Sequence, residues 1–146
     1  MKPPKPASES SASTVAWWSC PGVVYFLAAA EPPVAVKIGV AAQTGKRSLR
    51  AVVVRRLSQI QSSNHEPVQL LGVIPFTEGE YPMRDAEARE RELHGEFSQL
   101  QRFKSYSRGA EWFTVSPELL ARIDQIATPP EELDLPRTVC SLDVES

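Results

Sequence analysis

Cysteine is scarce in this sequence, and no cysteine-based metal motif is present. The two cysteines, Cys20 and Cys140, lie near opposite ends of the 146-residue chain, and no Cys-x-x-Cys or Cys/His metal spacing occurs. This pattern excludes a zinc-finger type of site and predicts a reduced, cytoplasmic protein without a structural disulfide. The chain also lacks an internal repeat and a Gly-rich loop of the kind that binds phosphates.

Long apolar runs are absent as well. The longest, Val23 to Ala30, is too short to cross a bilayer, and the basic N-terminus has no apolar segment behind it. The sequence therefore predicts neither a membrane segment nor a signal peptide. We expect one folded domain at residues 22–127, between a disordered Pro/Ser-rich tail at 1–21 and a disordered acidic tail at 128–146.

Acidic residues are missing between Pro32 and His65, although the net charge of -2 excludes a basic field over the whole protein. A basic run is usually a solvated helix face. The length of this run favours nucleic-acid binding instead, and DNA is the expected partner. The residues that we assign to this contact are Lys46, Arg47, Arg50 and Arg55.

Apolar periodicity predicts an α/β domain. Short runs rich in Val, Ile and Phe are typical of strands, and apolar residues three and four apart are typical of helices. The predicted strands cover residues 22–28, 34–40 and 68–76, with a short strand or extended segment at 111–115. The predicted helices cover 48–61 and 83–100, and a third begins at Ser116.

Two charged residues share the apolar stripes of these helices. Arg56 lies near the middle of the apolar arc of its helix, whereas Arg55 points roughly the opposite way. Glu90 is in phase with the apolar residues of the next helix. A buried charge needs a partner, so either Arg56 and Glu90 pair with each other or both face a charged ligand.

Tyr25 and Lys37 are the polar residues of the first two predicted strands. Strand alternation places Lys37 on one face between Ala35 and Gly39, whose small size leaves room for a close approach. We expect these two polar residues to meet the two helical charges at one site.

Five short motifs follow one another along the chain, and together they resemble the GIY-YIG nuclease superfamily. The most similar members are a phage- and bacterium-associated subfamily in which lysine likewise replaces the second tyrosine. The resemblance covers about residues 22–126 and implies a small three-stranded antiparallel sheet flanked by helices. The motifs are Val24-Tyr25-Phe26, Lys37-Ile38-Gly39, Arg56 to Gln61, Glu90 to His94 and Glu111-Trp112-Phe113.

The resemblance implies a metal-dependent DNA endonuclease. Glu90 would hold Mg²⁺ or Mn²⁺, Arg56 would clamp phosphate, and Tyr25 would activate water with Lys37 in support. Such a role requires a lowered pKa of Tyr25, which the neighbouring cations are expected to produce. The residues leave open whether Tyr25 or Lys37 is the base. His94 is either a partner of Glu90, a proton carrier or a histidine at the flank of the core.

Two other function classes compete with the enzyme. The first is a non-catalytic nucleic-acid-binding module of the same fold, and the second is a protein-interaction domain without a nucleic-acid role. No recognition domain is visible beside the predicted nuclease domain. We therefore expect a partner protein to supply the choice of target.

Overall fold

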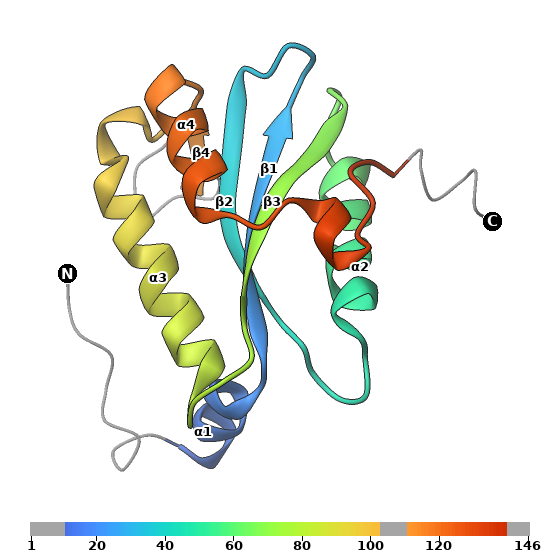
Figure 1. The fold of residues 1–146 in the computed structure, drawn as a ribbon, viewed down its shortest axis with the longest axis vertical. Coiled ribbons are helices and arrows are strands. Elements are labelled where there is room, and N and C mark those ends of the chain that lie inside the picture. Colours follow the sequence, from blue (N-terminus) through green and yellow to red (C-terminus); the bar gives the residue numbers. More distant parts are fainter. Residues whose placement is uncertain (1–10, 103–110, 140–146) are drawn as a thin grey trace.

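A four-stranded antiparallel sheet in the order β3-β1-β2-β4 forms the centre of the structure (Figure 1). The computed structural model describes residues 11–102 and 111–139. The α/β class predicted from the sequence is confirmed. Along the chain the elements are α1 (Ala12–Ser19), β1 (Gly22–Ala29), β2 (Ala35–Ala42), α2 (Leu49–Ser62), β3 (Val68–Phe76), α3 (Pro82–Glu96), η2 (Ser98–Leu100), β4 (Trp112–Thr114), α4 (Pro117–Ile126) and η3 (Pro130–Leu133).

The fourth strand is the main departure from the predicted three-stranded sheet. β4 has three residues and pairs with Ala35, Val36 and Lys37 at one end of β2. A segment this short has no periodicity from which pairing could be predicted. Its consequence is that the segment just before β4, including Glu111, is held against the outer edge of β2.

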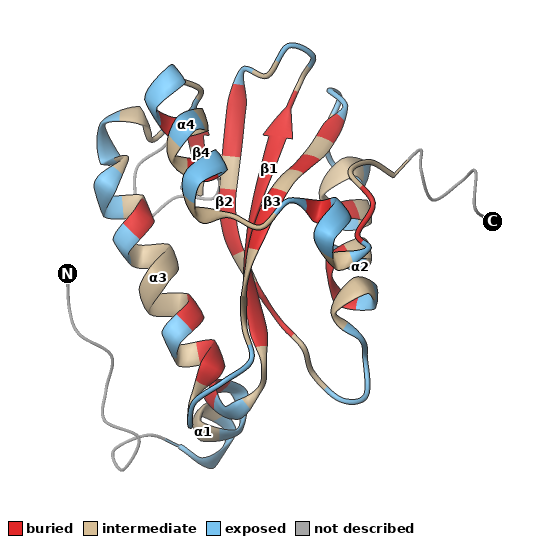
Figure 2. Cartoon of the chain, viewed as in Figure 1, coloured by how far each residue is buried: buried red, intermediate tan, exposed pale blue. Residues whose placement is uncertain are grey.

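β1 is buried along its whole length (Figure 2). Its side chains alternate between two cores. Val23, Tyr25 and Leu27 pack toward α2 and the C-terminal segment. Val24 and Phe26 pack toward α3 and α4. Burial on both faces explains why this strand has a continuous apolar sequence.

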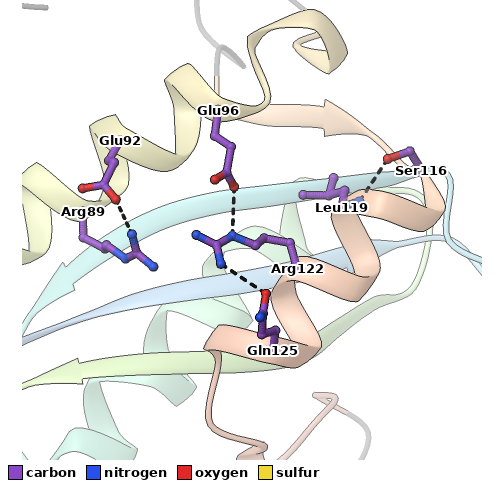
Figure 3. Close-up of polar contacts among 7 residues, drawn as sticks. All are labelled: Arg89, Glu92, Glu96, Ser116, Leu119, Arg122 and Gln125. Carbon is purple, nitrogen blue, oxygen red and sulfur yellow. Dashed lines mark hydrogen bonds and ion pairs between the residues drawn. The ribbon is translucent and has the colours of Figure 1, made fainter.

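Polar contacts hold α4 against α3 (Figure 3). The Arg122 Nε atom donates to the Glu96 carboxylate over 3.1 Å, and the same guanidinium donates to Gln125 over 3.2 Å. The hydroxyl of Ser116 caps α4 by accepting the Leu119 N–H at 3.1 Å.

Within the described residues, no helix is long and apolar enough to cross a membrane.

Residues 12–19 form α1 in place of the disorder expected for residues 1–21. Trp18 is buried, lies edge-on to Tyr81 at 6.2 Å between ring centroids, and has the Arg84 guanidinium 5.5 Å from its ring. Burial of the large apolar surface of Trp18 is enough to hold this short helix against the domain. The preceding residues 1–10 lie outside the described part of the chain.

The segment after α4 also replaces expected disorder with packing. Leu135 is 5% exposed and joins the core on the α2 side, with Leu133 against it. The Leu70 N–H of β3 donates to the Arg137 carbonyl over 2.7 Å. The mainly acidic segment 128–146 therefore contains a buried apolar residue, Leu135, that packs against the core. Residues 140–146 lie outside the described part of the chain.

Candidate active site

The Tyr25 ring leans across β2 at Gly39. The two residues are opposite each other in the β1–β2 pairing. A Cβ atom built on Gly39 would lie 2.5 Å from the Tyr25 hydroxyl oxygen and 2.6 Å from its Cζ atom. The small residues beside Lys37 were expected to leave room for a close approach. At Gly39 this room is occupied by the Tyr25 ring. The hydroxyl is carried toward the outer edge of β2.

Charged groups from other elements act on the Tyr25 hydroxyl. Burial has the largest effect and raises the pKa of Tyr25 far above its usual value. Arg56 on α2 lowers this pKa, whereas Glu111 and Glu90 raise it. The expected lowering of the Tyr25 pKa is therefore not found, because burial outweighs the arginine. The phenol is protonated at neutral pH.

Arg56 lies at the exposed edge of α2 rather than within its core face. With Tyr25, Val53 and Leu57 it lines a narrow crevice on the α2 side of the sheet. The helical phase places its Cβ at the apolar face, and the long side chain then carries the guanidinium out to solvent. No ion pair joins Arg56 to Glu90 or to another carboxylate of the described residues, so the mutual pairing considered from the sequence is not observed.

Glu90 is half-buried on α3, as its helical phase predicts. The pKa of Glu90 is raised from 4.5 to about 7, mainly by burial and then by repulsion from Glu111 and Glu87. Arg91 and Lys37 act in the opposite direction. Negative charge thus accumulates around a carboxyl that is partly withdrawn from water.

Lys37 is paired with Glu111, which the sequence offered only as part of the Glu-Trp-Phe motif. Its Nζ atom lies 2.9 Å from the Glu111 carboxylate and 5.8 Å from the centroid of the Trp112 ring. The Ile38 N–H also donates to the Glu111 carbonyl over 3.0 Å. The ion pair and the backbone contact together hold Lys37 beside Glu111 at the edge of β2.

His94 supports the backbone of β2. Its Nε2 atom lies 2.8 Å from the Ile38 carbonyl oxygen, so this nitrogen donates the hydrogen bond, and its ring lies 5.1 Å from that of Phe113. This arrangement matches the core-flank alternative for His94. The contact anchors α3 to the strand that carries Lys37 and Gly39.

We expect His94→Ala to lower the free energy of unfolding by about 1–3 kcal/mol, because the Ile38 carbonyl loses its donor. His94→Gln keeps an N–H donor and should restore most of this stability. Thermal unfolding of both variants checks the expectation. An equal loss of stability in the two variants would contradict it.

The residues assigned to nucleic-acid binding separate into two groups. Arg47 and Arg55 line one hollow together with Arg56. Arg55 therefore faces the same hollow as Arg56, whereas the sequence predicted that it points roughly the opposite way. Lys46 is exposed in the loop before α2. Arg50 instead donates to the Asp134 carbonyl and thereby holds the C-terminal segment.

The fold is that of a small α/β domain, and its class is given by a family match. The chain belongs to the T5orf172 domain family, whose match covers residues 22–128. This domain is found in nuclease-like proteins of phages and bacteria. Comparison with curated proteins and with solved structures found no match. α1 lies outside the matched residues.

Proposed function

We propose that this protein is a metal-dependent endonuclease of the GIY-YIG type that hydrolyses phosphodiester bonds in DNA. The observation that carries the proposal is the convergence on Tyr25 of Arg56 and Glu90, which come from helices on opposite faces of the sheet. Hydrolysis of a phosphodiester needs an oriented water, positive charge on the phosphoryl oxygens and stabilisation of the leaving oxygen.

Glu90 fits a divalent cation that keeps most of its water. Mg²⁺ and Mn²⁺ need only one or two protein carboxylates. Within residues 11–102 and 111–139, no group of three or more His, Cys, Asp or Glu side chains is placed to hold a metal. Burial, followed by the neighbouring Glu111 and Glu87, raises the pKa of Glu90, and a bound cation would stabilise the ionised carboxylate against these effects. Bound there, the ion would polarise a phosphoryl oxygen and neutralise the leaving oxygen.

Arg56 suits the phosphate. Its guanidinium is exposed and has no carboxylate partner among the described residues. A free guanidinium can hold two phosphate oxygens at once. Its place beside Tyr25 would set the bound phosphate next to the phenol.

Tyr25 is assigned to the attacking water, with Lys37 in support. As a neutral phenol it can orient a water by accepting or donating a hydrogen bond. Proton acceptance from the water requires the phenolate form of Tyr25, which positive charge near the hydroxyl favours, and Arg56 acts in that direction. The Lys37–Glu111 ion pair favours an electrostatic role for Lys37 over a role as base.

Incubation of the purified protein with supercoiled plasmid and Mg²⁺ or Mn²⁺ tests the proposal. Wild type should nick the plasmid, and Arg56→Ala or Glu90→Ala should slow nicking by about 10²–10³-fold. Matched controls are Arg122→Ala and Glu92→Ala, which carry the same changes at the contacts in Figure 3. Both controls should cleave normally.

A second candidate is a non-catalytic nucleic-acid-binding module. The hollow lined by Arg47, Arg55 and Arg56 favours it, because none of the residues lining that hollow is acidic. If wild type and both site variants bind DNA but are equally inert, the enzyme proposal fails and this candidate stands. If wild type binds no DNA even at low salt, both fail.

A further inference from the structure

A hollow of about 220 Å³ lies beside the candidate active site and shares Arg56 with it. Its lining combines one aromatic residue, two small apolar residues, and polar or basic residues. This hollow, which we term the arginine hollow, is lined by Trp17, Ala42, Thr44, Arg47, Val52, Arg55, Arg56 and Gln59.

Trp17 is the unusual member of this lining. Its neighbour Trp18 is 7% exposed, whereas Trp17 is 39% exposed, one of the two large apolar side chains that the described structure leaves open. The Trp17 indole is nevertheless fixed, because its Nε1–H donates to the Glu87 carboxylate over 2.5 Å. An exposed but oriented indole is the feature of a stacking surface rather than of a core residue.

The positive charge of the arginine hollow favours binding of an anion. Arg47, Arg55 and Arg56 make no ion pair with any described residue. Thr44 and Gln59 add neutral hydrogen-bonding groups. An aromatic face beside unpaired guanidinium groups is the combination with which proteins bind single-stranded nucleic acid.

We propose that the arginine hollow binds an unpaired nucleotide of the DNA substrate, with its base stacked on Trp17 and its phosphates on Arg55 and Arg56. The inference rests on the proposed function. In a duplex the face of each base is covered by its neighbours, so only an unpaired or terminal base can stack on a side chain. α1, which carries Trp17, lies outside the residues of the family match.

The test compares Trp17→Phe with Trp17→Leu. Both variants keep an apolar side chain and lose the indole N–H, but only phenylalanine offers an aromatic face. Fluorescence anisotropy at fixed salt and without metal would measure their affinities for a labelled oligothymidine and, by competition, for a relaxed closed circular duplex, which has no terminal base. Trp17→Leu should weaken binding of the oligothymidine by about 5- to 100-fold, with Trp17→Phe within about threefold of wild type.

Duplex affinity separates this inference from the proposed function. We expect the affinity for duplex DNA to change less than about twofold in both Trp17 variants. Arg55→Ala, in contrast, should weaken binding of both DNA forms. Equal affinities of Trp17→Phe and Trp17→Leu for the oligothymidine, with normal plasmid nicking, overturn the inference alone. Equal losses on single strand and duplex overturn it as well. Failure of wild type to bind either DNA overturns the proposed function.

Discussion

A Glu90→Gln variant is expected to be more stable than wild type at about pH 8 without metal, and to lose metal-dependent cleavage. The gain in stability follows from the raised pKa of Glu90. At this pH the wild-type carboxyl is ionised in a half-buried position, near two other acidic side chains. Glutamine has nearly the same shape and removes the charge.

The sign of the pH effect follows from proton binding. Between roughly pH 4.5 and 7 the folded protein binds the Glu90 proton more tightly than the unfolded chain does, since folding raises the pKa to about 7. Wild-type stability should therefore fall as the pH rises through this range and level off above it. With allowance for solvent at the half-exposed carboxyl, the effect is about 1–2 kcal/mol. Glu90→Gln should lack this component.

Denaturant unfolding at several pH values, with and without Mg²⁺, measures this effect. Mg²⁺ should stabilise wild type by binding the folded state, and should leave Glu90→Gln unchanged. Glu92→Gln is the matched control, because Glu92 lies on the same helix but is exposed and paired with Arg89. A Glu90→Gln protein that is less stable than wild type at about pH 8, or that cleaves normally, would contradict the expectation.

Much of the fold could be predicted because its strands are buried on both faces and its helices are amphipathic. The strand over residues 68–76 coincides with β3, and the predicted first helix agrees with α2 within one residue at each end. The two ends of the chain were missed for a shared reason. The composition of each end is dominated by polar residues and therefore predicts disorder. Order depends instead on one buried apolar residue at each end, Trp18 before the domain and Leu135 after it.

The site could be predicted less completely than the fold. Helical phase identified Glu90 as the inward-facing acid of α3, but it placed Arg56 near the middle of the α2 apolar arc, whereas the structure has Arg56 exposed at the edge of that core. Phase gives the direction of Cβ but does not give the reach of a long side chain, so the exposure of Arg56 was not foreseen. The raised pKa of Tyr25 depends on the depth of burial, which no local pattern contains.

Glu111 shows a second limit of sequence reasoning. It follows Glu90 by some twenty residues and lies just before a strand of only three residues. Its contact with Lys37 depends on β4 pairing with the outer edge of β2. Strand order is a tertiary property, so the sequence offered the Glu-Trp-Phe motif but not the ion pair.

Gly39→Ala is expected to displace Tyr25 and thereby to lower both stability and activity. No left-handed backbone is required at Gly39, so the effect is steric: the new Cβ would lie 2.5 Å from the phenolic oxygen. Overpacking of this kind costs about 1–3 kcal/mol, and a displaced phenol should slow cleavage by about 10²-fold. Unfolding curves and plasmid nicking measure the two effects.

A double-mutant cycle with Tyr25→Leu tests whether the tyrosine ring is the cause. The shorter leucine withdraws the atoms that the alanine Cβ would meet, so Gly39→Ala should cost much less stability in the Tyr25→Leu background than in wild type. An unchanged cost in that background would place the clash elsewhere in β2. A reduced cost would show that a glycine is needed on β2 because the Tyr25 ring lies over the strand at this position.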